Sequence, residues 1–311
     1  TSTLPYILHY VIGEGSFAKV YKGVSVRTQE NVAIKICRRL PRHREVPGNG
    51  ELDEAAVLKQ LKHPNIVTLL DSQIRPGQPE ILVLEYMCET DMLNAMEEDA
   101  IEHEQCVSFL IQAAEALDFM HSSGFVHLDF KVENMLINTN TNTVKLCDFG
   151  LAGRIGQIRT GHLHGTLPYM PPELVAMGDH DECELNAGLD AWSFGIVIFI
   201  VTFQRTLWGK ASADDRDYAS FVDGVAQGQQ DWMLAALSPQ LRRIVVQLLD
   251  PVAEARPSMQ RVAWVIQHNP WWSNEVPMPL VHAPDGDGLE GDGADGGGPD
   301  SPAPSRRGNT N

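Results

Sequence analysis

Two short polar segments near the middle of the chain constrain it more than any other feature. Residues 127–134 read HLDFKVEN, and residues 148–150 read DFG. Apolar runs flank them at residues 125–126, 135–137 and 144–147. This alternation predicts short paired strands joined by loops that present charged side chains. We therefore expect the chemistry of the chain in these loops.

The side chains of these loops match the needs of phosphoryl transfer. That reaction needs a carboxylate to orient a hydroxyl group, a cation near the transferred phosphoryl group, and oxygen ligands for Mg²⁺. Asp129, Lys131, Asn134 and Asp148 supply this set. An isolated Asp-Phe-Gly would indicate only an ordinary acidic turn. The combination of residues 127–134 with this triplet, at the observed separation, is a much more specific signal for phosphoryl transfer.

Together the two segments resemble the catalytic loop and the metal-binding triplet of the eukaryotic protein kinases. The resemblance implies that Asp129 accepts or orients the substrate hydroxyl and that Lys131 steadies the γ-phosphate of ATP. It implies that Asn134 and Asp148 hold Mg²⁺. Lys131 is also typical of the serine/threonine class, as is Thr166, whose hydroxyl is expected to touch the catalytic aspartate and the lysine.

A glycine-rich stretch at residues 13–20, GEGSFAKV, follows an alternating apolar segment at residues 6–12. Its glycines allow a hairpin backbone to approach phosphates. Such hairpins are common, however, and Ala18 replaces the third glycine of the kinase pattern. The stretch VAIK at residues 32–35 strengthens the signal, because it resembles the kinase strand whose lysine, here Lys35, grips the α- and β-phosphates.

Lys35 needs an anionic partner to hold its orientation. Residues 51–61 predict a helix in which Glu54 shares one face with two leucines. We therefore expect Glu54 to pair with Lys35. Glu51, three positions earlier on a similar face, is the competing residue.

By the same resemblance, ATP lies between a small and a large lobe. Phe17 caps the glycine-rich loop, Val20 lies against the base, the backbones of Glu85 and Met87 bind the base, and Asp91 reaches the ribose. The full set that the resemblance assigns to ATP is Ile12, Gly13, Glu14, Gly15, Ser16, Phe17, Ala18, Val20, Ala33, Lys35, Leu84, Glu85, Met87, Asp91 and Leu136.

Leu128 departs from the kinase pattern, which has arginine before the catalytic aspartate. That arginine gathers a phosphate on the activation segment, here residues 151–163. With leucine, the segment has lost its main internal anion receptor. We therefore expect activity that does not depend on phosphorylation of this segment, in which Thr160 is the obvious hydroxyl.

Three further features match structural elements of the family. Glu173 in a Pro-Pro-Glu triplet and Arg256 are expected to form a buried ion pair. Asp190 precedes a long apolar stretch that predicts a central buried helix, and it is expected to brace the catalytic-loop backbone. Residues 179–184 form an acidic insert, which we interpret as a solvated loop or, alternatively, a docking site for basic substrates.

Charge and cysteine content limit the partners and the compartment. The net charge of −17 at pH 7 argues against nucleic acid as a partner. The longest apolar run, residues 196–203, is too short to span a bilayer. Five cysteines without a C-x-x-C pair indicate reduced thiols in a cytoplasmic or nuclear protein. The histidine and cysteine spacings fit no standard zinc site.

The chain changes character near residue 277. Residues 283–311 are rich in Gly, Asp and Pro with almost no apolar content, which predicts a disordered tail over residues 277–311. Within it, residues 302–307, PAPSRR, weakly resemble an SH3-domain ligand. The predicted boundaries are 1–87 for the small lobe and 88–276 for the large lobe.

The expected fold is α+β and bilobal, with a small antiparallel β lobe carrying one helix and a larger, mainly helical lobe. The expected function is an ATP- and Mg²⁺-dependent serine/threonine protein kinase. A nucleotide-binding pseudokinase scaffold and a small-molecule kinase are the alternatives. Within the superfamily, the motifs are most similar to those of SH3-binding-domain kinases, and also resemble divergent kinases of large DNA viruses such as fish herpesviruses.

Overall fold

The structure, a computed structural model, describes residues 5–15, 18–38, 53–73, 78–87, 90–228 and 234–273. Ser16, Phe17 and the predicted tail therefore lie outside the described residues, as does Glu51, the alternative partner of Lys35. Within the described ranges, no helix combines the length and the apolar character needed to cross a membrane.

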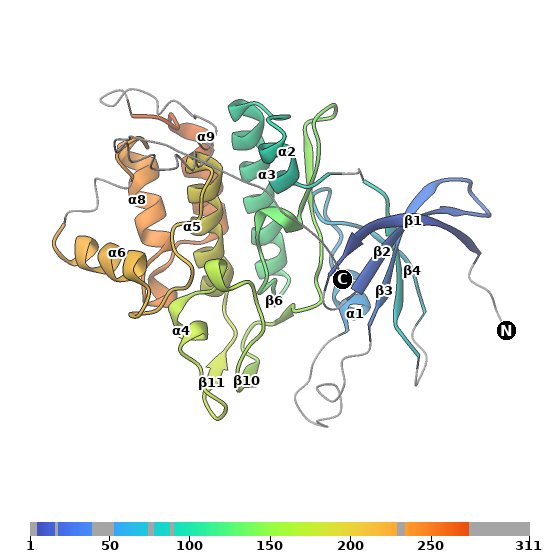
Figure 1. The fold of residues 1–311 in the computed structure, drawn as a ribbon, viewed down its shortest axis with the longest axis horizontal. Coiled ribbons are helices and arrows are strands. Elements are labelled where there is room, and N and C mark those ends of the chain that lie inside the picture. Colours follow the sequence, from blue (N-terminus) through green and yellow to red (C-terminus); the bar gives the residue numbers. More distant parts are fainter. Residues whose placement is uncertain are drawn as a thin grey trace, which may run out of the picture. The chain divides into compact units, whose positions relative to one another are not determined.

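The small lobe is a five-stranded antiparallel sheet in the order β1-β2-β3-β5-β4 (Figure 1). Its strands are β1 (Tyr6–Glu14), β2 (Ala18–Ser25), β3 (Asn31–Cys37), β4 (Leu69–Gln73) and β5 (Ile81–Glu85). The pairing of β3 with β5 places Lys35 opposite Leu82 in the centre of the sheet. The functional lysine thus lies on a strand that is paired along both edges.

The helix of the small lobe, α1 (Glu54–Leu58), is shorter than the sequence predicts. Asp53 begins it, because its carboxylate accepts a hydrogen bond from the Ala56 N–H. The predicted continuation to Leu61 is wrong: Gln60 N–H and Leu61 N–H bond to carbonyls three residues back, and the chain then turns away ahead of Pro64. Glu54 is consequently the first helical residue.

The large lobe is mainly helical (Figure 1). Its helices are α2 (Met92–Glu97), α3 (His103–Ser122), α4 (Pro172–Val175), α5 (Ala187–Phe203), α6 (Arg216–Ala226), α8 (Pro239–Leu248) and α9 (Met259–His268), with short 3₁₀ turns η1 (Val132–Asn134), η2 (Leu167–Tyr169) and η3 (Ala253–Ala255). Three small ladders join β6 (Phe125–Val126) to β9 (Gly153–Arg154), β7 (Met135–Asn138) to β8 (Thr143–Leu146), and β10 (Ile158–Thr160) to β11 (Glu182–Glu184).

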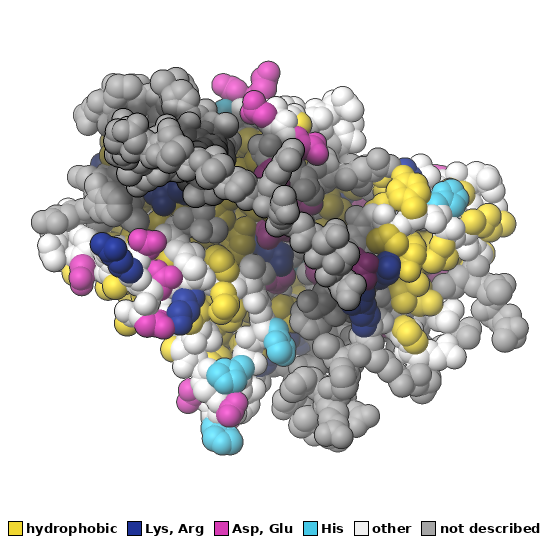
Figure 2. Space-filling model, in the orientation of Figure 1, with side chains coloured by type: hydrophobic (Ala, Val, Ile, Leu, Met, Phe, Trp, Pro, Cys, Tyr) yellow, Lys and Arg dark blue, Asp and Glu magenta, His cyan; other side chains and the backbone are white. Residues whose placement is uncertain are grey.

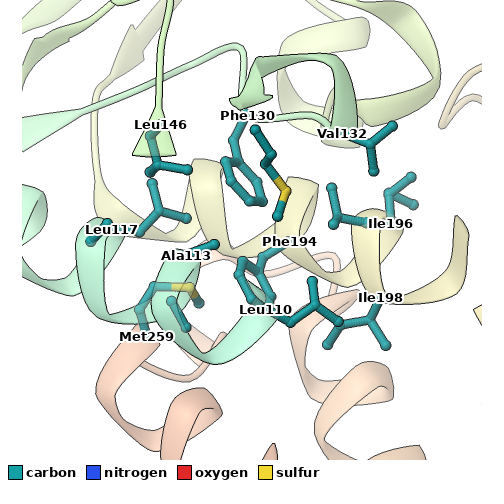
Figure 3. Close-up of a cluster of buried hydrophobic side chains, with 14 of the residues drawn as sticks. Leu110, Ala113, Leu117, Phe130, Val132, Leu146, Phe194, Ile196, Ile198 and Met259 are labelled. Atoms are coloured by element: carbon teal, nitrogen blue, oxygen red, sulfur yellow. The ribbon is translucent and has the colours of Figure 1, made fainter. Parts of the chain in front are cut away.

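Helix α5 is the central buried helix that the sequence predicts, and it anchors the catalytic loop. Every residue from Leu189 to Thr202 is buried. The Phe194 ring stacks on the ring of Phe130, with 5.4 Å between centroids, in a cluster that Figure 3 shows together with side chains of α3 and α9. Phe130 follows Asp129 directly, so the packing of the large-lobe core fixes the position of Asp129.

The acidic insert is not simply the solvated loop that we expected. Residues Glu182–Glu184 form β11, which pairs with β10 of the activation segment. Beyond the end of this ladder, His162 Nε2 lies 3.4 Å from Asp179 Oδ1, and both side chains are exposed. Figure 2 shows histidine and acidic side chains gathered in this part of the surface. The amino-acid composition of the insert does not reveal this antiparallel pairing with β10, because the pairing depends on the path of the chain between the two strands.

Candidate active site

Lys35 lies between two carboxylates. Its Nζ is 2.6 Å from Glu54 Oε2 and 2.6 Å from Asp148 Oδ1. The predicted partnership of Lys35 with Glu54 is therefore present. Burial alone would lower the pKa of Lys35, but the two carboxylates outweigh it and raise that pKa above its usual range. Lys35 is consequently a fixed cation at physiological pH.

Glu54 also fixes the metal-binding triplet. Its Oε1 accepts a hydrogen bond from Phe149 N–H (3.2 Å), and the buried Phe149 ring packs 4.9 Å from the ring of His127. Asp148 itself is half exposed and has φ +60°. Burial raises the pKa of Asp148, but the charge and hydrogen bond of Lys35 lower it further, so the net shift is downward. Asp148 therefore presents an ionised carboxylate.

Asp129, Lys131 and Thr166 form a closed network. Lys131 Nζ lies 2.8 Å from Asp129 Oδ2 and donates to Thr166 Oγ1 (2.7 Å). The Thr166 hydroxyl donates in turn to Asp129 Oδ1 (2.9 Å). This is the contact expected from the sequence, although 35 residues separate Lys131 from Thr166. The network holds the carboxylate of Asp129 in one orientation.

Asn134 links the catalytic loop to the metal-binding triplet. Its Nδ2 donates to the backbone carbonyl of Asp129 (2.7 Å), and its own carbonyl accepts from Cys147 N–H (3.0 Å). Within the described residues its side-chain oxygen has no hydrogen-bond partner, so it is available as a ligand. One amide oxygen and one carboxylate suit Mg²⁺, which binds few protein oxygens alongside phosphates. The residues present therefore fit Mg²⁺ with a nucleotide.

No group of three histidine, cysteine or acidic side chains within the described ranges is placed to hold a metal ion.

Asp190 braces the catalytic loop as predicted. Its carboxylate accepts from His127 N–H (2.8 Å) and Leu128 N–H (2.9 Å), and lies 2.8 Å from His121 Nε2. Leu128 has φ +66°, which is costly for a branched residue and persists only where other contacts hold it. Burial raises the pKa of Asp190, but the hydrogen bonds and charges of the histidines outweigh this effect and lower it.

The residues assigned to ATP line up along adjoining elements. The residues that lie on strands are Ile12 to Glu14 on β1, Ala18 and Val20 on β2, Ala33 and Lys35 on β3, Leu84 and Glu85 on β5, and Leu136 on β7. The others lie beside these elements: Gly15 is in the β1–β2 turn, Met87 just after β5, and Asp91 just before α2. The Gly15 N–H donates to the carbonyl of Ala18 (3.0 Å), which closes the hairpin. A Cβ at Gly15 would meet no atom of the described residues within 4 Å.

Three of these residues have side-chain contacts that the sequence did not suggest. Glu14 forms ion pairs with Lys19 and Arg38. Glu85 accepts from Lys145 (2.9 Å), which leaves only its backbone for a base. Asp91 caps α2 by accepting from Asn94 N–H (3.0 Å) and Asn94 Nδ2 (2.7 Å). The predicted ribose contact of Asp91 would therefore compete with its capping role.

Two residues of the site were not identified from the sequence as functional. The Tyr169 hydroxyl donates to Glu133 Oε2 (3.1 Å) beside the catalytic loop. Burial and the neighbouring Glu133 raise the pKa of Tyr169 above its usual range, so the hydroxyl keeps its proton. Arg159 bonds to carbonyls of residues 151 and 152. The Tyr169–Glu133 contact joins residues 36 apart, and the Arg159 contacts span only seven and eight residues but follow no regular helix or strand spacing.

A family model described as protein kinase domain matches residues 6–271, close to the extent over which the motifs are recognisable. The chain belongs to this family, and the bilobal α+β fold expected from the sequence is confirmed.

Similar curated proteins are plant kinases. CBL-interacting protein kinase 2 of Oryza sativa subsp. japonica is 30% identical over 279 residues, which are 86% of this chain and 58% of that protein. CBL-interacting serine/threonine-protein kinase 12 of Arabidopsis thaliana is 29% identical over 273 residues, covering 83% and 52%. The chain spans about half the length of these relatives.

Proposed function

We propose that the chain is an ATP-dependent serine/threonine protein kinase, which transfers the γ-phosphate of ATP to hydroxyl groups of proteins. The observation that supports this most is that two networks of polar side chains are connected to each other through Asn134. Lys35, Glu54 and Asp148 form one, and Asp129, Lys131 and Thr166 form the other. Asn134, bonded to Asp129 and lying next to the strand that leads to Asp148, connects them.

Each side chain has a role that follows from its position. Asp129 orients the hydroxyl of the substrate and receives its proton. Lys131 keeps a positive charge beside that carboxylate, where negative charge develops on the transferred group. Lys35, held by Glu54, orients the nucleotide phosphates, while Asn134 and Asp148 would hold Mg²⁺. When bound, Mg²⁺ neutralises phosphate charge.

Two alternatives from the sequence are less well supported. A pseudokinase scaffold would be favoured by loss of Lys35, Asp129 or Asp148, and all three are present with their contacts. A small-molecule kinase generally lacks the elements that form a peptide-binding shelf. Here the Glu173–Arg256 ion pair holds that region in place.

Transfer of labelled phosphate from Mg-ATP tests the function. We expect label on serine and threonine of mixed basic proteins, and none on small alcohols such as choline or ethanolamine. Label on the small alcohols alone would show a small-molecule kinase. Mg²⁺-dependent ATP binding without any transfer would show a scaffold.

Basic proteins are the proposed substrates. Glu133 matches a position at which some kinases hold arginine near the phosphorylation site, and its carboxylate is fixed by the Tyr169 hydroxyl (3.1 Å). The net charge of −17 also favours basic partners. Narrower proposals rest on the sequence alone. An SH3 domain is the proposed partner of residues 302–307, and the proposed location is cytoplasmic or nuclear. The proposed affiliation is with SH3-binding-domain kinases or, alternatively, with kinases of large DNA viruses.

We also propose that the activity does not require phosphorylation of the activation segment. Leu128 is buried in an apolar cluster with Met170, Leu174 and Leu185, against which Leu151 and Leu163 pack. Apolar contacts thus hold both ends of residues 151–163. Position 128 offers no positive charge to attract a phosphate.

Phosphatase treatment is accordingly expected to leave activity unchanged. Thr160 lies directly across the ladder from Glu182, so Thr160→Glu should lower activity by about two- to fivefold, because like charges on opposite strands repel. Thr160→Gln, which adds the same bulk without charge, should not. Higher activity in Thr160→Glu, or inactivation by phosphatase, would contradict the proposal.

A further inference from the structure

Arg159 lies on β10 and reaches back to the turn that follows the metal-binding triplet. Its Nη1 donates to the carbonyl oxygen of Leu151 (3.1 Å), and its Nη2 donates to that of Ala152 (3.0 Å). One planar guanidinium group therefore fixes two consecutive carbonyl groups. A lysine ammonium group, which is a compact point charge, cannot reproduce this geometry.

Other hydrogen bonds close the same turn. Ala152 N–H donates to the carbonyl of Phe149 (3.2 Å), and Phe149 N–H donates to Glu54 Oε1 (3.2 Å). Asp148 enters this turn with φ +60°, a conformation that non-glycine residues keep only where surrounding contacts hold it. The contacts at residues 149–152 therefore hold the backbone from which the Asp148 side chain extends, while Lys35 contacts its Oδ1 directly (2.6 Å).

The β10–β11 ladder holds Arg159 in place. Arg159 pairs with Cys183 in the register of the ladder. Gly156 N–H donates to the carbonyl of Leu185 (2.8 Å), which extends the pairing by further backbone contact. Strand β11 of the acidic insert therefore pairs with the strand that carries Arg159 and holds that strand in place.

The backbone at Gly153 passes very close to this support. A Cβ at Gly153 would lie 2.4 Å from Leu185 Cδ1 and 2.9 Å from Arg159 Nη2. Glycine at this position therefore leaves room for the Leu185 side chain and the guanidinium group, one or both of which would have to shift to accommodate a larger residue.

We propose that Arg159 is a positioning residue for Asp148. Its guanidinium group holds the turn at residues 149–152, and this turn sets the direction of the carboxylate that would bind the metal ion. The contact uses only groups of the chain itself, so it forms without any modification of the activation segment. The inference rests on the proposed kinase function, since that function makes Asp148 a metal ligand.

Hydrogen–deuterium exchange of the full chain without nucleotide tests the contact directly. In Arg159→Gln, the backbone amides of residues 149–155 should exchange about tenfold faster than in wild type, because loss of the carbonyl contacts favours local opening. Arg159→Lys should show much of the same increase, since it keeps the charge without the two-point geometry. Unchanged exchange in both variants would overturn the proposal, whether or not the chain is a kinase.

Kinetic measurements distinguish a role of Arg159 in positioning Asp148 from a role only in stabilising the turn. Arg159→Gln should raise the Mg²⁺ concentration for half-maximal phosphate transfer about tenfold, because hydrogen bonds from a charged donor are lost, while KM for the protein substrate changes little. Faster exchange with an unchanged Mg²⁺ requirement would overturn the positioning role. Absence of transfer by wild type would refute the kinase function instead, and the exchange result would still decide the contact.

Arg154 offers a matched control. It lies exposed on β9, with its guanidinium group 5.0 Å from the ring centroid of Phe125. Arg154→Gln removes the same charge nearby and should match wild type in both measurements. An equal effect in Arg154→Gln would overturn the proposal, because loss of positive charge alone would then explain the result.

Discussion

Asp129→Asn is expected to lower the turnover number about 10²- to 10⁴-fold, the range usual for a general base. The substitution keeps the size of the side chain but removes the carboxylate that orients the substrate hydroxyl. Asparagine keeps one of the two oxygens, so one of the contacts that Lys131 and Thr166 make with the carboxylate can persist. The affinity for ATP and the melting temperature should therefore change little. Single-turnover transfer of labelled phosphate measures the effect.

The matched control for Asp129→Asn is Glu115→Gln, which removes one negative charge from an exposed position on α3. It should retain full activity. Undiminished turnover of Asp129→Asn would refute the assignment of Asp129. Because a contaminating kinase would be unaffected by the substitution, loss of transfer also shows that the activity belongs to this chain.

Arg256→Ala is expected to destabilise the fold by about 3 kcal/mol, the lower end of the cost of breaking a buried ion pair, because the Glu173 carboxylate that is left alone is 28% exposed. Arg256 donates to Glu173 Oε1 (2.6 Å) and Oε2 (2.9 Å), and its side chain is fully buried. It also donates to the carbonyls of Asp250 (2.8 Å) and Gly188 (2.9 Å). Alanine would leave these groups without their donor.

Urea unfolding of wild type and Arg256→Ala measures this loss. Arg243→Ala is the control, since Arg243 is exposed on α8 and its removal should change the free energy of unfolding little. A free energy of unfolding of Arg256→Ala within about 1 kcal/mol of wild type would show that the pair does not contribute as a buried ion pair.

The proposed catalytic residues could be grouped from the sequence because they are close together in the chain. Asp129, Lys131 and Asn134 belong to one loop between short strands, and a short separation fixes Asp148 relative to them. Glu54 could be chosen over Glu51 from helical periodicity. The ion pair with Lys35 was therefore predictable, although 19 residues separate the two.

Other contacts could not be predicted from local patterns. The capping of α2 by Asp91 and the contact of Glu85 with Lys145 involve residues that had been assigned to ATP. The early end of α1 also differs from the periodic pattern. The contact of Glu85 with Lys145 joins residues 60 apart and depends on the fold, whereas the capping contact of Asp91 with Asn94 is local and follows from where α2 begins.

The sequence by itself determined the family, and it also supplied the proposed reaction and the side chains proposed for it, because phosphoryl transfer demands particular groups at short and fixed separations. Only the tertiary structure decided how residues 151–163 are held. Leu128 could be seen to lack charge, but its apolar cluster and the β10–β11 ladder join segments that are distant in the chain, and this ladder positions Arg159. Such long-range contacts form through burial and strand pairing, which no local pattern specifies.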